Sequence, residues 1–159
     1  MNKCIWILLI GLVVVTSCKK DESQAEDQAD IDEALIQEYL TTNNITDATK
    51  LESGVYYIID SLGDGSGVYP NYASLIRVHY RGYYLDESEF DPGNFDDIPV
   101  DFTLFEMIGG WQVGLPYFEK ESKGRLFIPS AYGYGTIGAQ DIPPNTVLIF
   151  DIHLVNVFE

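Results

Sequence analysis

The residues best suited to chemistry in this chain lie between positions 131 and 151. They form a tyrosine- and glycine-rich loop, an Ile-Pro-Pro turn and an alternating apolar strand. The glycines permit backbone angles that a residue with a Cβ resists, while Pro143 and Pro144 remove two backbone donors and push Ile142 toward an extended conformation. A rigid loop that leads into a strand presenting Phe150 inward suits an apolar binding pocket with few polar groups.

Other kinds of site find weaker support in the sequence. His79 and His153 each lie in a strand pattern without a closely spaced partner, so we expect structural roles for both. The acidic residues between Asp91 and Asp97 do not follow the spacing of an EF-hand loop. No Ser-His-Asp arrangement and no phosphate-binding glycine loop is readable. We therefore expect neither a metal ion nor another cofactor.

The elements around this site are predicted from apolar periodicity. Residues 31–51 should form an amphipathic helix over 31–45 and a connection, with Ile31, Leu35 and Tyr39 on an apolar stripe that Ile36 and Leu40 widen. We expect this helix to pack on the domain; a contact arm is the alternative. Residues 52–159 should form one α+β domain with a short helix over 111–118 that Pro116 bends. The expected strands are 55–59, 75–80, 83–85, 100–104, 124–128 and 147–158.

The N-terminal residues 1–17 are predicted to be a lipoprotein signal peptide. Lys3 precedes a short apolar run, and Val15-Thr16-Ser17-Cys18 resembles a bacterial lipobox. The apolar run is too short for a spanning helix, which needs about 20 residues. Cleavage would leave Cys18 as the only cysteine, so no intramolecular disulfide is expected. We predict lipidation of Cys18 and a lipid-anchored location in the cell envelope, at the periplasmic or surface face of an outer membrane; an ordinary cleaved signal is the alternative.

The chain is strongly acidic, with a formal net charge of −16. Such a surface repels phosphate backbones and anionic lipid headgroups, so we expect no nucleic-acid binding, and lipid would be the membrane attachment. Residues 18–30 are polar and acidic, and we expect them to be a flexible, disordered tether. The charges directly after Cys18 resemble the export tags of Bacteroidetes-like surface lipoproteins, although a solvated spacer explains them equally well.

A series of short motifs occurs in order along the chain: Val78-His79-Tyr80-Arg81-Gly82, Phe90-Asp91, Ile108-Gly109-Gly110-Trp111, Gly114-Leu115, Lys123, Ile128-Pro129, Ala131-Tyr132-Gly133, Ile142-Pro143-Pro144-Asn145 and Phe150-Asp151. Together they resemble the FKBP-type peptidyl-prolyl cis-trans isomerase domain over residues 52–159. Each motif is weak alone, but the ordered combination is highly specific. The fold that the resemblance implies is a twisted antiparallel β-sheet wrapped around one short helix, with the active site between them.

The resemblance also implies roles for individual residues. Trp111 would form the floor under a proline ring. The Tyr132 hydroxyl and the Ile108 backbone N–H would bind substrate carbonyls, and Asp91 would place a polar group beside the rotating bond. The remaining substrate-binding residues would be Tyr80, Phe90, Phe102, Met107, Ile142 and Phe150.

The implied activity is isomerisation of X-Pro bonds in exported chains, with no covalent intermediate. The alternative is a non-catalytic chaperone or surface adaptor that binds proline-containing segments. Expected partners are such segments and macrolide inhibitors, and the protein is expected to be a monomer. Some positions depart from the family pattern. Val100 replaces an aromatic residue and Pro92-Gly93-Asn94 replaces serines, and both changes bear on substrate and macrolide binding. Asp141 stands at an apolar rim position, and Phe118 replaces a methionine.

Overall fold

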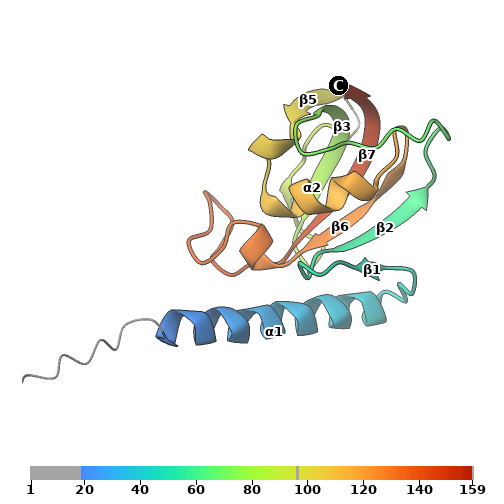
Figure 1. Cartoon of the computed structure of the whole chain (residues 1–159). Coiled ribbons are helices and arrows are strands. Elements are labelled where there is room, and N and C mark those ends of the chain that lie inside the picture. The colour runs from blue at the N-terminus through green and yellow to red at the C-terminus, as the bar shows by residue number, and fades with distance from the viewer. Residues whose placement is uncertain (1–18, 96, 159) are drawn as a thin grey trace, which may run out of the picture.

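The computed structural model describes residues 19–95 and 97–158. An antiparallel sheet of seven strands curves around the short helix α2, and the long helix α1 runs beneath the sheet (Figure 1). This arrangement confirms the predicted α+β fold. The helices are α1 (Lys19–Thr42) and α2 (Gly109–Gly114), with 3-10 turns η1 (Leu104–Glu106), η2 (Leu115–Tyr117) and η3 (Ser130–Tyr132). The strands are β1 (Thr49–Lys50), β2 (Tyr56–Ser61), β3 (Leu75–Tyr83), β4 (Glu89–Asp91), β5 (Val100–Thr103), β6 (Lys123–Ile128) and β7 (Leu148–Phe158).

The long strands β3 and β7 pair along almost their whole length and form the middle of the sheet. The strand order is β1-β2-β6-β7-β3-β4, and β5 pairs with the first half of β3 while β4 pairs with its end. Side chains alternate between the two faces of a strand. The predicted apolar set of β7 therefore lies on the α2 side, in the core around Trp111: Leu148, Phe150, Ile152 and Leu154.

Helix α2 lies close to the sheet because two of its three glycines face the sheet. A Cβ on Gly110 would lie 2.4 Å from the Ile128 side chain, and one on Gly114 would lie 2.6 Å from that of Leu126. The chain continues from α2 into η2, which contains Pro116. The predicted short, bent helix is therefore confirmed, and it ends at Gly114 because proline interrupts the α-helical hydrogen bonds.

Helix α1 begins at Lys19, so the predicted disordered tether over 18–30 is wrong from that residue onward. Alanine, glutamine, glutamate and lysine are all good helix formers, and the acidic composition hid this propensity. The helix packs on the domain, as expected, and it lies on the sheet face opposite α2. The residues that it buries differ in part from the predicted apolar stripe. Ile36 and Leu40 are buried, whereas Ile31 is 52% and Leu35 is 38% exposed. The buried pair meets apolar residues of three strands and the residue before β7: Tyr56, Ile58, Phe127, Ile149 and Val147.

Short and edge strands account for the other differences from prediction. Tyr83 is the last residue of β3 and not the start of a new strand, because the chain turns at 84–88 with Glu87 at a φ of 66°. The three-residue strand β4 and the two-residue strand β1 were not predicted, and β1 precedes the predicted domain start at residue 52. Strands this short leave too few residues for an alternating pattern.

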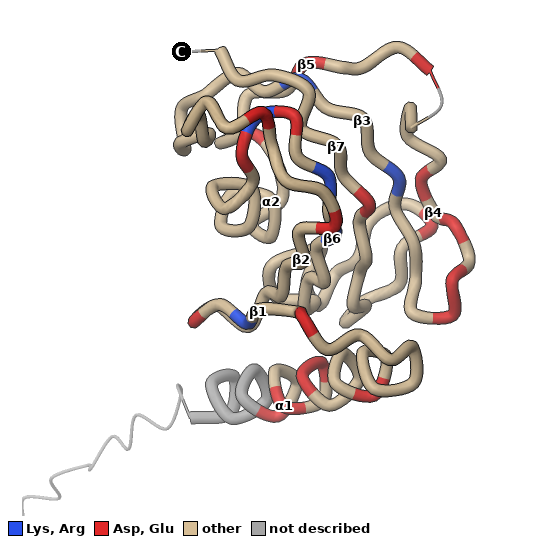
Figure 2. The backbone as a smooth tube through the Cα atoms, turned by 90° about the vertical axis from the view of Figure 1, so that its right-hand side faces the viewer, with Lys and Arg blue, Asp and Glu red and all other residues tan. Residues whose placement is uncertain are grey.

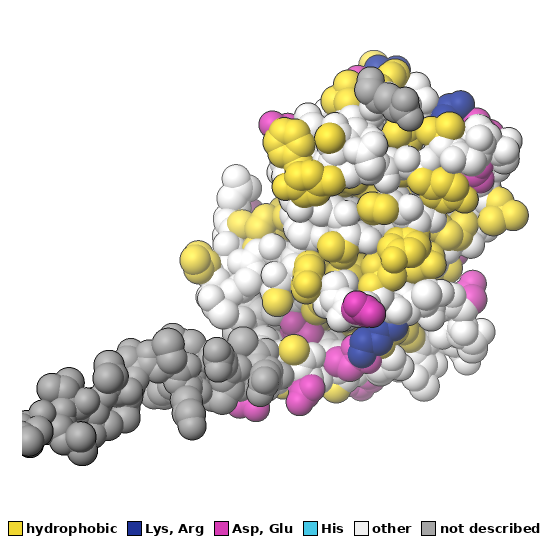
Figure 3. Space-filling model, in the orientation of Figure 1, with side chains coloured by type: hydrophobic (Ala, Val, Ile, Leu, Met, Phe, Trp, Pro, Cys, Tyr) yellow, Lys and Arg dark blue, Asp and Glu magenta, His cyan; other side chains and the backbone are white. Residues whose placement is uncertain are grey.

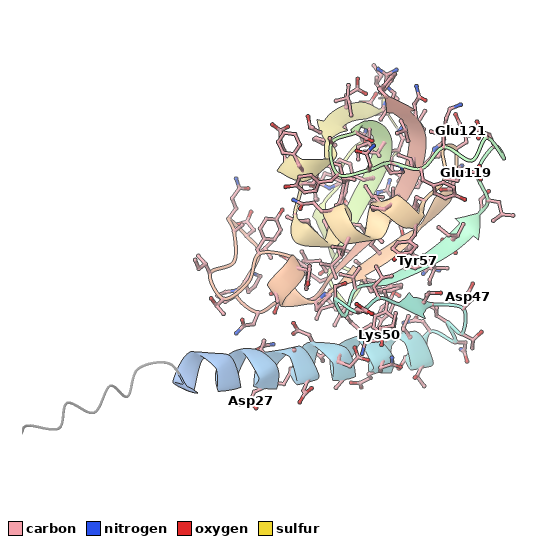
Figure 4. All side chains as sticks on the ribbon, in the orientation of Figure 1. Asp27, Asp47, Lys50, Tyr57, Glu119 and Glu121 are labelled. Atoms are coloured by element: carbon pink, nitrogen blue, oxygen red, sulfur yellow. The ribbon has the colours of Figure 1, made fainter. Side chains whose placement is uncertain are left out.

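Charged residues lie mainly on the outside of this fold. Acidic residues follow α1 and the turn between β3 and β4, and basic residues are few (Figure 2). In Figure 4, Lys50 lies beside α1, where its Nζ is 2.9 Å from Glu33 Oε1. None of the described helices combines the length and the apolar character needed to cross a membrane. The predicted signal peptide and Cys18 lie outside the described residues.

Candidate active site

Three aromatic rings from three strands surround Trp111, the centre of the candidate site. Trp111 is 2% exposed and comes from α2. Its ring centroid lies 5.4 Å from Tyr80, 5.5 Å from Phe150 and 6.1 Å from Phe102, with interplanar angles of 80°, 89° and 84°. Such edge-to-face contacts are the preferred geometry of aromatic pairs. The structure thus brings together four of the residues that the sequence placed at the site.

Phe90 of β4 extends this cluster toward the surface. Its ring is 5.5 Å from that of Phe150, at 87°. Gly82 of β3 makes room for it, since a Cβ there would lie 2.5 Å from the Phe90 ring. On the outer side, the Tyr84 ring lies 5.1 Å from Phe90. Phe90 is therefore held between two strands and joins the buried cluster to the open rim.

A cavity of about 420 Å³ opens beside Phe90, between β4 and the loop that follows η3. Its wall combines apolar side chains with two carboxylates, which is the composition expected of a site that orients a largely apolar ligand. Hydrophobic side chains are spread over the α2 side of the molecule, and acidic ones gather below along α1 (Figure 3). The cavity is lined by Phe90, Asp91, Tyr134, Ala139, Gln140, Asp141 and Ile142.

Tyr134, and not Tyr132, is the tyrosine of this loop that lines the cavity. Tyr134 is 37% exposed, and burial and then the Asp91 charge raise the pKa of its hydroxyl. Tyr132 packs against the core, and a Cβ on Gly109 would lie 3.1 Å from its ring. Tyr132 ends the 3-10 turn η3 and lies beside the first residue of α2, next to Ile108, and its predicted role as a hydrogen-bond donor stays a prediction.

Asp91 links the cavity to the aromatic cluster. Its Oδ1 accepts a hydrogen bond from Gly93 N at 2.8 Å. Burial, the Asp91 charge and a hydrogen bond with Asp91 together raise the pKa of Tyr80 to about 12. The Tyr80 hydroxyl is therefore protonated at neutral pH and available as a donor to the Asp91 carboxylate.

Met107 and Ile108 immediately precede α2 and pack, half-buried, against the core around Trp111. The Ile108 carbonyl accepts hydrogen bonds from the first turn of α2, at 3.0 Å from Trp111 N and 3.3 Å from Gln112 N. Within the described part of the chain no hydrogen bond uses the Ile108 N–H. This donor is therefore available to an external carbonyl.

The rim of the cavity is fixed by Tyr84, whose hydroxyl donates to the Asp141 carbonyl at 2.9 Å. Sequence reasoning missed Tyr84, because its only signal is one more aromatic residue at the end of an apolar strand. The Asp141 side chain lines the cavity, so Asp91 and Asp141 make this rim negative. None of the described residues that line the cavity carries a cationic side chain.

The two histidines lie away from this cavity. Their rings stack at 5.5 Å from paired positions of β3 and β7, and His79 Nδ1 is 3.0 Å from the Asn94 carbonyl oxygen. Strand alternation places them on the sheet face opposite Trp111. No cluster of three or more His, Cys, Asp or Glu side chains suited to a metal ion occurs among residues 19–95 and 97–158.

Comparison with known proteins assigns a family to this arrangement. Residues 67–155 match the family described as FKBP-type peptidyl-prolyl cis-trans isomerase. Two similar relatives, both named FKBP-type peptidyl-prolyl cis-trans isomerase FkpA, come from Buchnera aphidicola (37% identity, 87% of this chain and 56% of the relative) and Aeromonas hydrophila (33% identity, 90% and 51%). The chain spans about half the length of these curated relatives.

Solved structures agree with this assignment. The crystal structure of FkpA from Escherichia coli aligns with a TM-score of 0.71 and 29% identity, covering 86% of this chain and 63% of that one. A peptidyl-prolyl cis-trans isomerase from Pseudomonas syringae aligns with a TM-score of 0.72 and 28% identity, covering 84% and 96%. The predicted resemblance is confirmed at the level of the family; an origin among Bacteroidetes-like lipoproteins stays a prediction. The chain belongs to the FKBP-type peptidyl-prolyl cis-trans isomerase family.

Proposed function

We propose that this protein is a peptidyl-prolyl cis-trans isomerase that acts on X-Pro bonds in polypeptide segments. The observation that carries the proposal is the cluster of perpendicular rings around Trp111, next to a cavity with Phe90, Asp91, Tyr134 and Ile142 in its wall. A proline ring is compact and apolar, and it would lie against this cluster while the preceding amide reaches the polar side of the cavity.

The reaction needs no nucleophile and no cofactor. Rotation about a peptide bond has a barrier of about 18–20 kcal/mol, because the planar amide loses its resonance on twisting. The planar amide is more polar than the twisted one, so an apolar, water-poor pocket disfavours the ground state relative to the transition state. Aromatic walls supply this environment, and a few donors then hold the flanking carbonyls in place.

The Tyr132 hydroxyl is the donor that we assign to the substrate carbonyl near the rotating bond, and we assign Tyr134 as a second donor at the cavity. Its position in the cavity wall and the raised pKa of its hydroxyl support this role, since a protonated hydroxyl can donate. The free N–H of Ile108 would bind a second substrate carbonyl, and Asp91 would lie beside the rotating bond. Met107 and Phe102 would complete the apolar lining, and macrolides would compete for the same pocket.

The negative rim favours certain substrates. Asp91 and Asp141 both line the cavity, and no cationic side chain in its wall offsets them. Like charges repel most strongly where water is partly excluded. Segments with lysine or arginine next to proline should therefore bind better than segments with aspartate or glutamate there.

We further propose that the protein works in the cell envelope and is held there by lipid on Cys18. The signal-like N-terminus supports this location. The substrates would then be newly exported chains that wait on slow X-Pro steps. Replacing Cys18 by alanine should move the protein from the membrane to the soluble fraction, and an unchanged membrane fraction would contradict lipid attachment.

A protease-coupled assay on a Lys-Pro peptide tests the proposed activity. The wild type should accelerate isomerisation, and Trp111→Leu should reduce kcat/KM by at least about tenfold, since the pocket floor is lost. Tyr117→Phe is the matched aromatic control, because Tyr117 is 48% exposed and stacks on Tyr57 outside the cavity. A wild type without activity, or equal activity in Trp111→Leu, would contradict the proposal.

A further inference from the structure

We propose that Asp32 of α1 is a positioning residue for the loop that carries Tyr132 and Tyr134, so that the N-terminal helix takes part in setting the geometry of the site. The inference rests on the proposed function, in which the hydroxyls of these two tyrosines bind substrate carbonyls. Asp32 touches no part of the cavity wall; it acts through Ser130.

The contact at Asp32 is buried and complete. The residue is 1% exposed and Ser130 is 2% exposed. Asp32 Oδ2 accepts hydrogen bonds from Ser130 N at 2.7 Å and from Ser130 Oγ at 2.6 Å, and its Oδ1 accepts one from Gln28 Nε2 at 2.8 Å. Burying a carboxylate is unfavourable unless donors compensate it, so three donors on one buried group indicate a contact that the fold maintains.

Ser130 passes this contact on to the active-site loop. It is the first residue of η3, and its carbonyl accepts hydrogen bonds from Gly133 N at 3.0 Å and Gly135 N at 2.9 Å. These two amides flank Tyr134 on either side. One residue therefore donates two hydrogen bonds to α1 and accepts two from the segment that holds the cavity tyrosine.

The rest of the loop is fixed from its far end. The Gly135 carbonyl accepts from Asn145 N at 2.8 Å, and the Tyr134 carbonyl accepts from Gly138 N at 3.1 Å. Gly135 has a φ of +61°, which a residue with a Cβ adopts reluctantly. The position of Tyr134 thus depends on the anchor at Ser130 and on the anchor at Asn145, and only the first involves α1.

The helix is well placed to hold this anchor. Residues of α1 and η3 are neighbours in space, and Figure 1 shows η3 at the end of β6 directly above the helix. Ile36 and Leu40 fasten α1 to the sheet one and two turns beyond Asp32, on the same helix face. Asp32 is therefore fixed by packing on one side and bonded to Ser130, 98 residues later in the chain, on the other.

Activity assays on the full chain test the positioning role. Asp32→Ala should reduce kcat/KM by about tenfold, with kcat affected more than KM, because small misplacements of a catalytic donor are costly. Asp32→Asn keeps an acceptor for Ser130 and should retain activity within about twofold. Asp30→Ala, at an exposed position of the same helix, removes the same charge and should leave kcat/KM unchanged. Thermal unfolding of each variant identifies an assay temperature at which all variants are folded. Ser130→Ala is a milder second variant, because it loses only the hydroxyl donor and keeps the backbone N–H donor.

A double-mutant cycle with the Tyr132→Phe/Tyr134→Phe variant separates positioning from general support of the fold. If Asp32 acts through these two hydroxyls, Asp32→Ala should cost less than about twofold in the Tyr132→Phe/Tyr134→Phe background. Equal losses in both backgrounds would overturn the inference.

Amide hydrogen exchange supplies a readout that does not depend on activity. Asp32→Ala should increase exchange at Gly133 and Gly135 beyond any change in the strands. Unchanged exchange at these amides would overturn the inference, even for a wild type that proved inactive. An inactive wild type in the assay would instead contradict the proposed function.

Discussion

Tyr132 and Tyr134 are two neighbouring residues of one type that lie in different surroundings. Tyr132 packs against Gly109 and the core, while Tyr134 lines the cavity beside Asp91. The motif Ala131-Tyr132-Gly133 singled out Tyr132, and nothing in the sequence marked Tyr134 as a residue of the cavity wall.

A pair of tyrosine-to-phenylalanine variants tests the two hydroxyls. Each variant keeps its ring and should lower kcat/KM by about three- to tenfold, because a hydrogen bond of about 0.5–1.5 kcal/mol to the substrate is lost. Proline-peptide assays on both variants check the expectation. A change of less than about twofold in Tyr132→Phe or in Tyr134→Phe would contradict the donor role of that tyrosine.

Tyr80 provides a pH-dependent test of the packing around Asp91. Its folded-state pKa is about 12, above the ordinary value of 10.0, so folding stabilises the protonated hydroxyl. This contribution is complete below pH 10 and disappears as the pH rises toward 12. Urea unfolding at pH 9 and pH 11 should show a larger loss of stability in the wild type than in Tyr80→Phe. Equal losses in the two proteins would contradict the role of Tyr80.

At the scale of elements, α1 belongs to the folded unit that carries the site. Its buried face meets the sheet through Ile36 and Leu40, and Asp32 continues the same stripe toward η3. The amphipathic pattern correctly predicted a helix that packs on the domain. It did not predict which side of the helix is buried. Asp32 belongs to the buried side, and an aspartate cannot be recognised as buried before its partner Ser130 is known.

Two isoleucines on α1 give a matched test of this packing. Ile36 is fully buried, so Ile36→Ala should lower the free energy of unfolding by about 2–4 kcal/mol. Ile31 is 52% exposed, and Ile31→Ala should change it by less than about 0.5 kcal/mol. Chemical denaturation of both variants provides the comparison. Similar values for the two would mean that α1 does not pack as described.

The remaining elements show what sequence patterns could and could not supply. Leu148, Phe150, Ile152 and Leu154 alternate along β7, so this strand and its core face were predictable. Phe90 was placed at the site by its motif, but β4, which carries it, is only three residues long and has no pattern of its own. The cavity wall at residues 139–141 follows a turn next to Gly138, which the sequence marked as a flexible position, and is held by Tyr84, which the sequence did not mark.

The whole molecule combines a strongly negative surface with a buried aromatic site. Acidic residues follow α1 and the β3–β4 turn (Figure 2), and two more carboxylates line the cavity. The net charge of −16 of the chain repels acidic segments. Basic, proline-containing chains are therefore the partners that its electrostatics favour.

The most direct test of the proposed activity is the cis–trans exchange rate of a Lys-Pro peptide, measured by NMR exchange spectroscopy with a small amount of the protein. We predict exchange at least about tenfold faster than the uncatalysed process, which takes tens of seconds or longer. We also predict a smaller effect on a Glu-Pro peptide, because Asp91 and Asp141 line the cavity. Saturable binding of the Lys-Pro peptide without faster exchange would contradict the account and would indicate a non-catalytic proline-binding module.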